Sequence, residues 1–243
     1  RLLHELIVEH GLYKDIAAQG VPSAVTGAAA TIHALANNGT FADEAARFAI
    51  AWKKRLESSS HGLDATELEA ERARQAGFAR GSGVYALFAA ACAKRGWLTF
   101  DDLMLHPVRL LRGAGVAAAM CRDDYRHFVV DEFQDVNAGQ IELLRLLCPP
   151  DKRPDLCVVG DDDQSIYEFR GADDRALAKF ENIWGLTAAA RLPLSENYRS
   201  EAPIVAIANA IMGADRTMRS KCEAGSTALR SRMLPPIECA SAM

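Results

Sequence analysis

The amino-acid sequence predicts an α/β fold with a parallel sheet and an all-helical N-terminal region. Over residues 1–95, apolar side chains recur at spacings of three and four, the period of helices that bury one face. After residue 96, short apolar runs alternate with helical segments, which is typical of parallel strands joined by helices. Acidic residues follow each apolar run, at the strand end where ligands bind in such sheets.

The composition is that of a folded domain and argues against several other classes of protein. Of 243 residues, 49% are hydrophobic and 25% are charged, which argues against disorder, collagen and coiled coil. No apolar run approaches the ~20 residues of a membrane span, so we expect no membrane contact. With 28 basic and 32 acidic side chains the net charge is -4, so any nucleic-acid contact must come from a local site.

The six cysteines do not indicate a disulfide scaffold, and no two of them have CxxC spacing. We expect reduced thiols, mostly core filler, in a cytoplasmic protein. The N-terminus shows no signal peptide. The chain starts at Arg1 without a methionine, from which we expect that it begins inside a longer protein.

The helical region is expected to contain two loops and a long helix. Gly, Pro and Ser residues interrupt the apolar period at residues 20–23 and 58–62. The following helix is charged over residues 67–74, which predicts a solvated face, and it continues as an apolar helix over residues 84–93. Gly96 is expected to end it.

Two strands are predicted in the second half of the chain, at residues 128–130 and 156–159. Because both runs are apolar throughout, we expect helices to cover both faces of their sheet. The chain after Gly213 is expected to be irregular. The helices predicted around these strands cover residues 103–112, 138–147, 175–184 and 202–212.

The first candidate site follows the strand at residues 128–130. A buried strand that ends in adjacent carboxylates suits a magnesium–nucleotide site. Asp131 would hold the metal, largely through water, and Glu132 would orient and deprotonate an attacking water. An acidic loop without any chemistry explains this pair of residues, taken alone, equally well.

The second candidate site follows the strand at residues 156–159. Gln164 is a neutral amide that could contact a phosphate oxygen. Tyr167, Phe169 and Arg170 would form a platform on which the bases of a single strand stack. The alternative is that these aromatic side chains are core packing.

The third candidate site is the segment of residues 192–200. Arg199 follows a strand, and Tyr198 is beside it, so a guanidinium could reach a γ-phosphate and a ring could reach a purine. Alone this signal is weak, because an arginine at a helix start is more often part of a surface ion pair.

Together the three sites resemble motifs of the UvrD/Rep/PcrA family of superfamily 1 DNA helicases, in order and in spacing. Motif II corresponds to DEFQD at 131–135, motif III to GDDDQSIYEFRGA at 160–172, and motif IV to NYRS at 197–200. The LTFDDL stretch at 98–103 resembles the family sequence that precedes motif II. The resemblance is firm over residues 80–212 and implies an incomplete P-loop NTPase (RecA-like) sheet with an N-terminal helical insertion.

The resemblance implies a role for each matching residue. Asp131 is the magnesium-associated acid, Glu132 the catalytic base, and Gln164 the sensor of the γ-phosphate. Tyr198 stacks on adenine, and Arg199 contacts the γ-phosphate. The implied cofactors are ATP and Mg²⁺.

The resemblance also implies a motor that moves 3′ to 5′ on DNA, with single strands and duplex junctions as partners. Tyr167 and Phe169 lie along the single strand, and Arg170 bridges the ATP and DNA sites. The implied domains are a helical insertion (1–95), the C-terminal part of the first motor domain (96–190), and the start of the second motor domain with a tail (191–243). Several DNA pathways use this motor, DNA repair among them, and the motifs do not separate them.

The phosphate-binding loop of the family is missing from this sequence. That loop requires a Gly-Lys-Ser/Thr sequence, and no lysine of the chain follows a glycine. Two explanations stay open: a part of a longer helicase, and a catalytically dead module that binds DNA or a partner protein. A Rossmann-like enzyme is disfavoured, because the chain also lacks a glycine-rich dinucleotide loop.

Overall fold

The computed structural model describes residues 1–12, 20–58, 62–113, 115–152, 155–166, 176–187, 190–212 and 218–222. The chain divides into two compact units, Arg1–Gly185 and Leu186–Met243. Within the described ranges, no helix combines the length and the apolar character that crossing a membrane requires.

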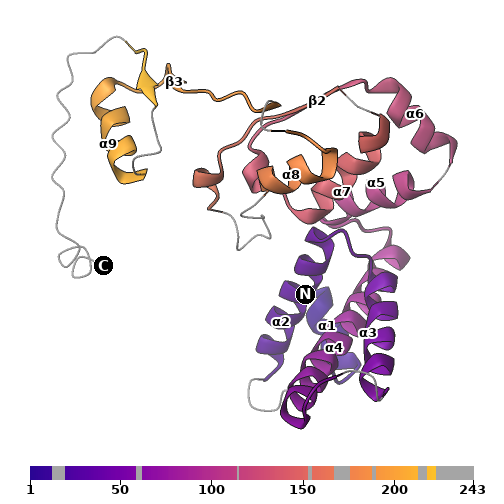
Figure 1. The fold of residues 1–243 in the computed structure, drawn as a ribbon. Coiled ribbons are helices and arrows are strands. Elements are labelled where there is room, and N and C mark those ends of the chain that lie inside the picture. The colour runs from indigo at the N-terminus through magenta and orange to yellow at the C-terminus, as the bar shows by residue number, and fades with distance from the viewer. Residues whose placement is uncertain are drawn as a thin grey trace, which may run out of the picture. The chain divides into compact units, whose positions relative to one another are not determined.

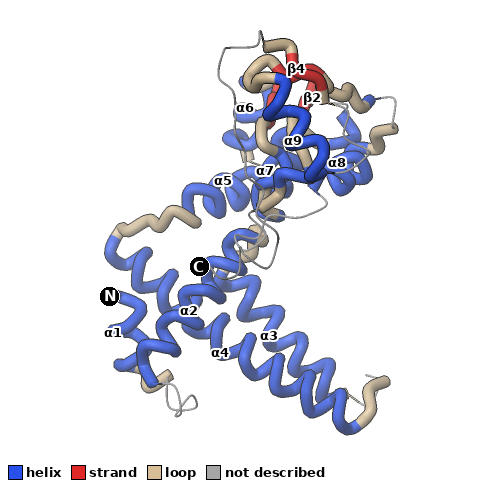
Figure 2. Tube along the Cα trace, turned by 90° about the vertical axis from the view of Figure 1, so that its left-hand side faces the viewer, coloured by secondary structure: helices blue, strands red, loops and turns tan. Residues whose placement is uncertain are grey.

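The described part of residues 1–95 is helical, which confirms the prediction. Its helices pack into a bundle in which α3 lies along α4 (Figures 1 and 2). They are α1 (Leu2–Glu9), α2 (Gly20–Asn37), α3 (Ala42–Glu57) and α4 (Ala65–Arg95). Alanines and a few larger apolar side chains fill the bundle core: Ile7, Ala24, Ala28, Ile32, Ala45, Val84 and Tyr85.

Helix α4 is continuous through its charged and apolar halves, as predicted. Its first turn carries a capping box. The Asp64 carboxylate accepts the N–H of Glu67 at 2.8 Å, and the Glu67 carboxylate accepts the N–H of Asp64 at 3.0 Å. Gly96 has a left-handed backbone (φ 64°) and ends the helix, as expected.

The loop predicted at residues 20–23 is wrong, because α2 already begins at Gly20. Pro22 lies in the first helical turn, where its missing N–H would have no partner within the helix anyway. Ser58 and Gly62 lie between α3 and α4, as the second predicted loop requires. Residues 59–61 of that loop are outside the described part of the chain.

The strands form a parallel pair, as predicted. In β1 (His127–Val130) and β2 (Asp155–Val158), Val130 is opposite Val158. Helices α5 (Asp102–Arg112), α6 (Val116–Asp124), α7 (Ala138–Leu147) and α8 (Ala176–Trp184) accompany them, with 3₁₀ turns η2 (Phe133–Asp135), η3 (Pro150–Lys152) and η4 (Asp162–Gln164). The helices predicted at 103–112, 138–147 and 175–184 are confirmed as α5, α7 and α8, although Arg175 lies outside the described residues.

One face of this sheet packs on helices, and the other is open within the described part of the chain. Phe128, Val130 and their partners on β2 pack against a core built from η2, α7 and α8. Val129 alternates to the opposite face and is 74% exposed, and Cys157 beside it is exposed too. The expectation that helices cover both faces is therefore wrong for these residues, because this core lies on one side only.

The bundle and the sheet region meet where the end of α2 approaches the start of α7. A side chain at Gly139 would collide with Met104, and its Cβ would lie 3.0 Å from the Asn37 carbonyl oxygen and from the Gly39 N. Asn137, the N-cap of α7, also donates its amide to the Asn37 Oδ1 atom at 3.2 Å. The backbones pass this closely because position 139 has no side chain.

An arginine reinforces the same junction. The Arg112 guanidinium pairs with Glu44 of α3 at 3.0 Å and with Glu142 of α7 at 3.3 Å. Exposed ion pairs contribute only about 0–1 kcal/mol each, so the close packing at Gly139 carries more of the stability here.

The second unit contains a short parallel pair and one described helix. Its elements are β3 (Glu196–Asn197), α9 (Ala202–Met212) and β4 (Arg219–Ser220). Helix α9 matches the prediction for residues 202–212. The sequence did not predict β4, because a two-residue strand has no periodic signal. Residues 213–217 and 223–243 of the tail lie outside the described chain.

The five described cysteines are free thiols, as expected. Burial raises the pKa of the Cys148 thiol to about 11. Cys92 is buried as well, but Cys157 is exposed. The expectation that the cysteines are mostly core filler therefore holds only for Cys92 and Cys148 among the described ones.

We expect Gly139→Ala to lower the free energy of unfolding by about 1–3 kcal/mol, because the new methyl group overpacks the junction of α2 and α7. Gly77→Ala in α4 is the matched control: nothing lies within 4 Å of its Cβ position, so helix propensity should stabilise it by roughly 0.5–1 kcal/mol. Urea unfolding of both variants measures the change in the free energy of unfolding, which should be negative for Gly139→Ala and positive for Gly77→Ala. Equal effects would contradict the packing at Gly139.

Candidate functional site

The loops that follow β1 and β2 are joined by backbone hydrogen bonds beyond the ends of the strands. The N–H of Val159 donates to the Val130 carbonyl at 2.8 Å, and the N–H of Phe133 donates to the Val159 carbonyl at 2.9 Å. The acidic residues after both strands therefore meet at the carboxyl edge of the sheet, as the sequence predicted.

Glu132 has the only positive φ among the described residues other than glycine, with φ 51° and ψ 45°. This left-handed conformation costs a non-glycine residue roughly 1–2 kcal/mol. Two hydrogen bonds of the loop support it. The N–H of Glu132 donates to Asp131 Oδ1 at 2.9 Å, and the carbonyl of Glu132 accepts the N–H of Asp135 at 2.9 Å. Both side chains of the predicted acid pair remain exposed.

Gln134 is a site residue that the sequence reasoning missed. Its side chain is 2% exposed and lies between the two loops. Its Nε2 donates to Glu132 Oε2 at 2.7 Å, and its Oε1 accepts the N–H of Asp161 at 3.0 Å. A Cβ on Gly160 would lie 2.8 Å from Gln134 Oε1, so glycine makes room for this amide. The available signal was a neutral amide between Phe133 and Asp135 in the DEFQD motif.

Gln164 lies in η4, on the loop after β2, and its side chain is exposed. Its Nε2 donates to Asp161 Oδ2 at 2.8 Å. The same Asp161 donates its N–H to Gln134, so Gln164 and Glu132 are connected through two intervening residues. The structure thus brings three sequence-predicted residues, Asp131, Glu132 and Gln164, to one edge of the sheet.

The residues predicted to contact DNA, Tyr167, Phe169 and Arg170, lie outside the described part of the chain. Their contact with a single strand therefore stays a prediction.

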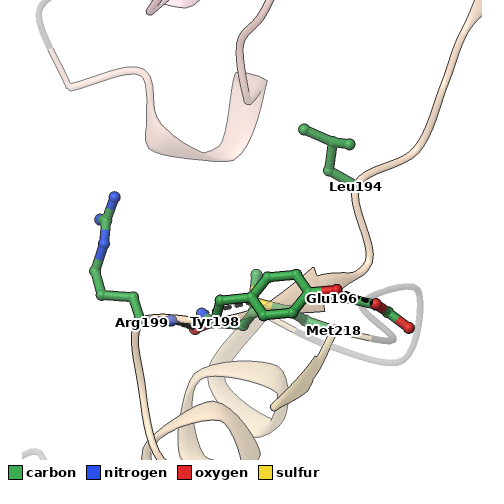
Figure 3. Close-up of a pocket in the computed structure, with 6 residues that line it drawn as sticks. Leu194, Glu196, Tyr198, Arg199 and Met218 are labelled. Carbon is green, nitrogen blue, oxygen red and sulfur yellow. Dashed lines mark hydrogen bonds between the residues drawn. The ribbon is translucent and has the colours of Figure 1, made fainter. Parts of the chain in front are cut away.

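In the second unit, Tyr198 and Arg199 line a cavity of about 480 Å³ (Figure 3). The cavity is open and follows β3, where the sequence predicted an arginine after a strand. Its lining consists of Leu194, Glu196, Asn197, Tyr198, Arg199 and Met218. Figure 3 shows the Arg199 side chain pointing away from the Tyr198 ring.

Glu196 holds the Tyr198 side chain in place. The Tyr198 hydroxyl donates to Glu196 Oε2 at 2.5 Å, and Lys221 Nζ is 3.2 Å from Glu196 Oε1. The hydrogen bond from Tyr198, followed by that from Lys221, lowers the pKa of the Glu196 carboxyl. The hydrogen bond to Glu196 in turn raises the pKa of the Tyr198 phenol.

Asn197 shapes the turn that presents Arg199. Its Oδ1 accepts the N–H of Arg199 at 2.9 Å and the N–H of Ser200 at 2.8 Å, which forms an Asx turn. The Arg199 guanidinium makes no ion pair with any residue of the described chain. No role for Asn197 was predicted from the sequence, although asparagine is a common turn residue.

The sequence of this chain matches a known protein family. Residues 12–184 match the UvrD/REP helicase N-terminal domain. The chain belongs to this family. The match includes α2 to α8 and both predicted acidic loops, so the resemblance seen in the DEFQD motif is confirmed.

Curated relatives of this UvrD/REP family member are ATP-dependent DNA helicases. The chain is 40% identical over 129 residues to the ATP-dependent DNA helicase UvrD1 of Mycobacterium tuberculosis, which covers 51% of this chain and 16% of the relative. It is 35% identical over 161 residues to the ATP-dependent DNA helicase Rep of Salmonella typhimurium, which covers 66% of this chain and 22% of the relative. The matched segments thus span about a fifth of these relatives.

The acid pair fits a magnesium ion that also binds phosphates. Mg²⁺ prefers carboxylate oxygens, keeps several waters, and takes only one or two protein carboxylates in such sites. Asp131 is exposed and offers a carboxylate beside Glu132. Within the described ranges, no three His, Cys, Asp or Glu side chains gather as a metal cluster.

We expect Glu196→Gln to lower the pKa of Tyr198 toward its ordinary value, because the variant weakens the hydrogen bond that the phenol donates and removes the negative charge beside it. NMR titration of tyrosines labelled in the ring measures this shift. Tyr85 is an internal control, since burial raises its pKa to about 12 and its environment is in the other unit. An unchanged Tyr198 titration would show that Glu196 does not bind it in solution.

Proposed function

We propose that this chain is the part of an ATP-dependent 3′–5′ DNA helicase or translocase that couples hydrolysis of Mg²⁺-ATP to movement on single-stranded DNA. The observation that carries the proposal is the hydrogen-bonded edge that joins Glu132, Gln134, Asp161 and Gln164, in a member of the UvrD/REP family. Relatives that bear the name ATP-dependent DNA helicase support the reaction class.

Asp131 and Glu132 divide the hydrolytic work in this proposal. Asp131 holds Mg²⁺, which would offset negative charge on the phosphates when bound. Glu132 accepts a proton from a water molecule as the water oxygen forms a bond to the γ-phosphorus. The bond from that phosphorus to its bridging oxygen breaks, and ADP leaves with the electron pair. The exposed Glu132 carboxylate is accessible to such a water.

Three further residues recognise the nucleotide in this proposal. Gln164 contacts a γ-phosphate oxygen through its exposed amide. Arg199 contributes a guanidinium to the same phosphate, and its lack of an ion pair with any described residue leaves it available. Tyr198, 70% exposed, offers its ring to the adenine.

The DNA partner is assigned by the motif at residues 160–172. Tyr167 and Phe169 stack on bases of the single strand, and Arg170 bridges the DNA and ATP sites. Stacking of this kind contributes about 1–3 kcal/mol per base. Duplex junctions and the remainder of a longer helicase chain are the other proposed partners.

The domain assignment follows the same proposal. Residues 1–95 form a helical insertion, residues 96–190 the C-terminal part of a first RecA-like motor domain, and residues 191–243 the start of a second motor domain and its tail. The parallel pairing of β1 and β2 and the helical nature of residues 1–95 support it.

A catalytically dead module that binds DNA or a protein is the second candidate. The missing Gly-Lys-Ser/Thr sequence favours it for this chain taken alone, because no backbone cradle for the phosphates is present in the sequence. The intact Asp131, Glu132, Gln164 and Arg199 favour the helicase.

In a full-length helicase that carries this chain, we expect Glu132→Gln to preserve nucleotide binding and to lower ATP turnover by about 10²–10⁴-fold, because the amide cannot accept the water proton. Phosphate release measures turnover, and a fluorescent nucleotide measures binding. Glu69→Gln on the exposed side of α4 is the matched control and should leave both unchanged. An unaltered turnover rate in Glu132→Gln would refute the proposed base.

For the 243-residue chain by itself, we expect very weak or no ATP binding, since it has no phosphate-binding loop. Isothermal titration with Mg²⁺-ATP is the measurement, and a single-stranded oligonucleotide titrated in parallel tests the binding-module candidate. Micromolar ATP affinity would contradict the expectation, and tight oligonucleotide binding without ATP binding would favour the second candidate.

A further inference from the structure

We infer that Gln134 is a positioning residue that orients the base Glu132 and ties it to the loop of the phosphate sensor Gln164. The inference rests on the proposed function and adds a residue to it. Gln134 lies three positions from Asp131 in the sequence and almost completely inside the protein.

The Gln134 amide has only one orientation that satisfies both neighbours. Its Nε2 faces a carboxylate oxygen of Glu132 at 2.7 Å, and its Oε1 faces the N–H of Asp161 at 3.0 Å. A flipped amide would set an oxygen against the Glu132 carboxylate and a donor against the Asp161 N–H. Both contacts would then be repulsive, so the chemistry of the neighbours fixes the amide direction.

This amide leaves Glu132 with one carboxylate oxygen for chemistry. Oε2 is held by Gln134, and the other oxygen belongs to an exposed side chain that solvent reaches. The hydrogen bond from Gln134 restricts the rotamers of the Glu132 side chain. A general base requires such fixed geometry, because a displacement of about 1 Å costs on the order of 10²-fold in rate.

The second contact of Gln134 connects the base to the sensor. Asp161 donates its N–H to Gln134 and accepts the Gln164 amide on Oδ2 at 2.8 Å. If Gln164 turns from Asp161 to a phosphate oxygen, the Asp161 loop loses one hydrogen bond. The hydrogen bond from the Asp161 N–H to Gln134 would pass that change to the Gln134 side chain. Glu132 and Gln164 are thus connected by three consecutive hydrogen bonds, of which the two made by Gln134 are partly buried and the one from Gln164 to Asp161 is exposed.

The Gln134 side chain is closely packed. Gly160 approaches it so closely that a Cβ would lie 3.2 Å from the Gln134 N and 2.8 Å from its Oε1. The 3.5 Å contact from Ser165 Oγ to the Gln134 carbonyl adds a further link to the sensor loop.

Steady-state kinetics of the full-length helicase that carries this chain test the inference. Gln134→Glu keeps the size of the side chain but removes the N–H donor to Glu132, and Gln134→Leu removes both contacts. We expect each to lower kcat by about 10–100-fold with little change in KM. Gln75→Leu is the matched control. Gln75 is also a buried amide, donating to the Ala49 carbonyl at 2.9 Å, and its loss should lower stability while kcat stays unchanged.

A double variant separates this inference from the proposed function. If Gln134 acts through Glu132, Gln134→Leu added to Glu132→Gln lowers turnover no further, whereas independent roles give additive losses. Additive losses, or a normal kcat in both Gln134 variants, overturn the inference and leave the assignment of Glu132 intact. Normal turnover in Glu132→Gln alone overturns the proposed function instead.

Hydrogen exchange on the 243-residue chain gives a readout that needs no activity. Gln134→Leu should speed exchange of the Asp161 amide about tenfold, since that N–H loses its acceptor, while Gln75→Leu leaves it unchanged. Unchanged Asp161 exchange in a folded Gln134→Leu protein would show that the contact is absent in solution and would overturn the inference.

Discussion

The parallel pairing of β1 with β2 is the interaction that positions both loops of the candidate site. It places the last residue of each strand side by side, and the backbone bonds between Val130, Val159 and Phe133 extend the pairing into the loops. The acids after β1 and the Asp161 loop after β2 therefore face each other, and the Gln134 side chain joins them. Helices α7 and α8 stabilise this geometry from one side, because Phe133 and Phe180 pack edge to face in the same core.

Close backbone packing and ion pairs both hold the helical bundle against this sheet region. Gly139 permits α7 to start against the end of α2, and Asn137 caps α7 while it contacts Asn37. The segment from Glu132 to Asn137 is short, so the position of α7 also fixes the loop of the predicted base. The contacts at Gly139 and Asn137 therefore connect this loop to the end of α2 in the bundle.

Local sequence signals predicted the parts of the fold that depend on local physics. The apolar runs predicted both strands, and the acidic residues marked the carboxyl ends of those strands. The helices predicted at residues 138–147 and 202–212 have the observed bounds. The role of Gln134 could not be predicted in this way, because its acceptor contact is with Asp161, 27 residues away. The open face at Val129 was missed for a related reason: coverage of a strand depends on which helices reach it. The start of α2 was missed because Gly20 and Pro22 are turn residues as well as tolerated first-turn residues.

If Glu132 is the proposed base, its left-handed backbone sets stability against catalysis at one position. Glycine or asparagine would adopt this conformation at lower cost, so selection for stability alone would drive position 132 away from glutamate. Selection for turnover would retain the acid and tolerate the strain. A library randomised at this position and sorted in two ways, by thermal resistance and by catalysis, would diverge to different residues.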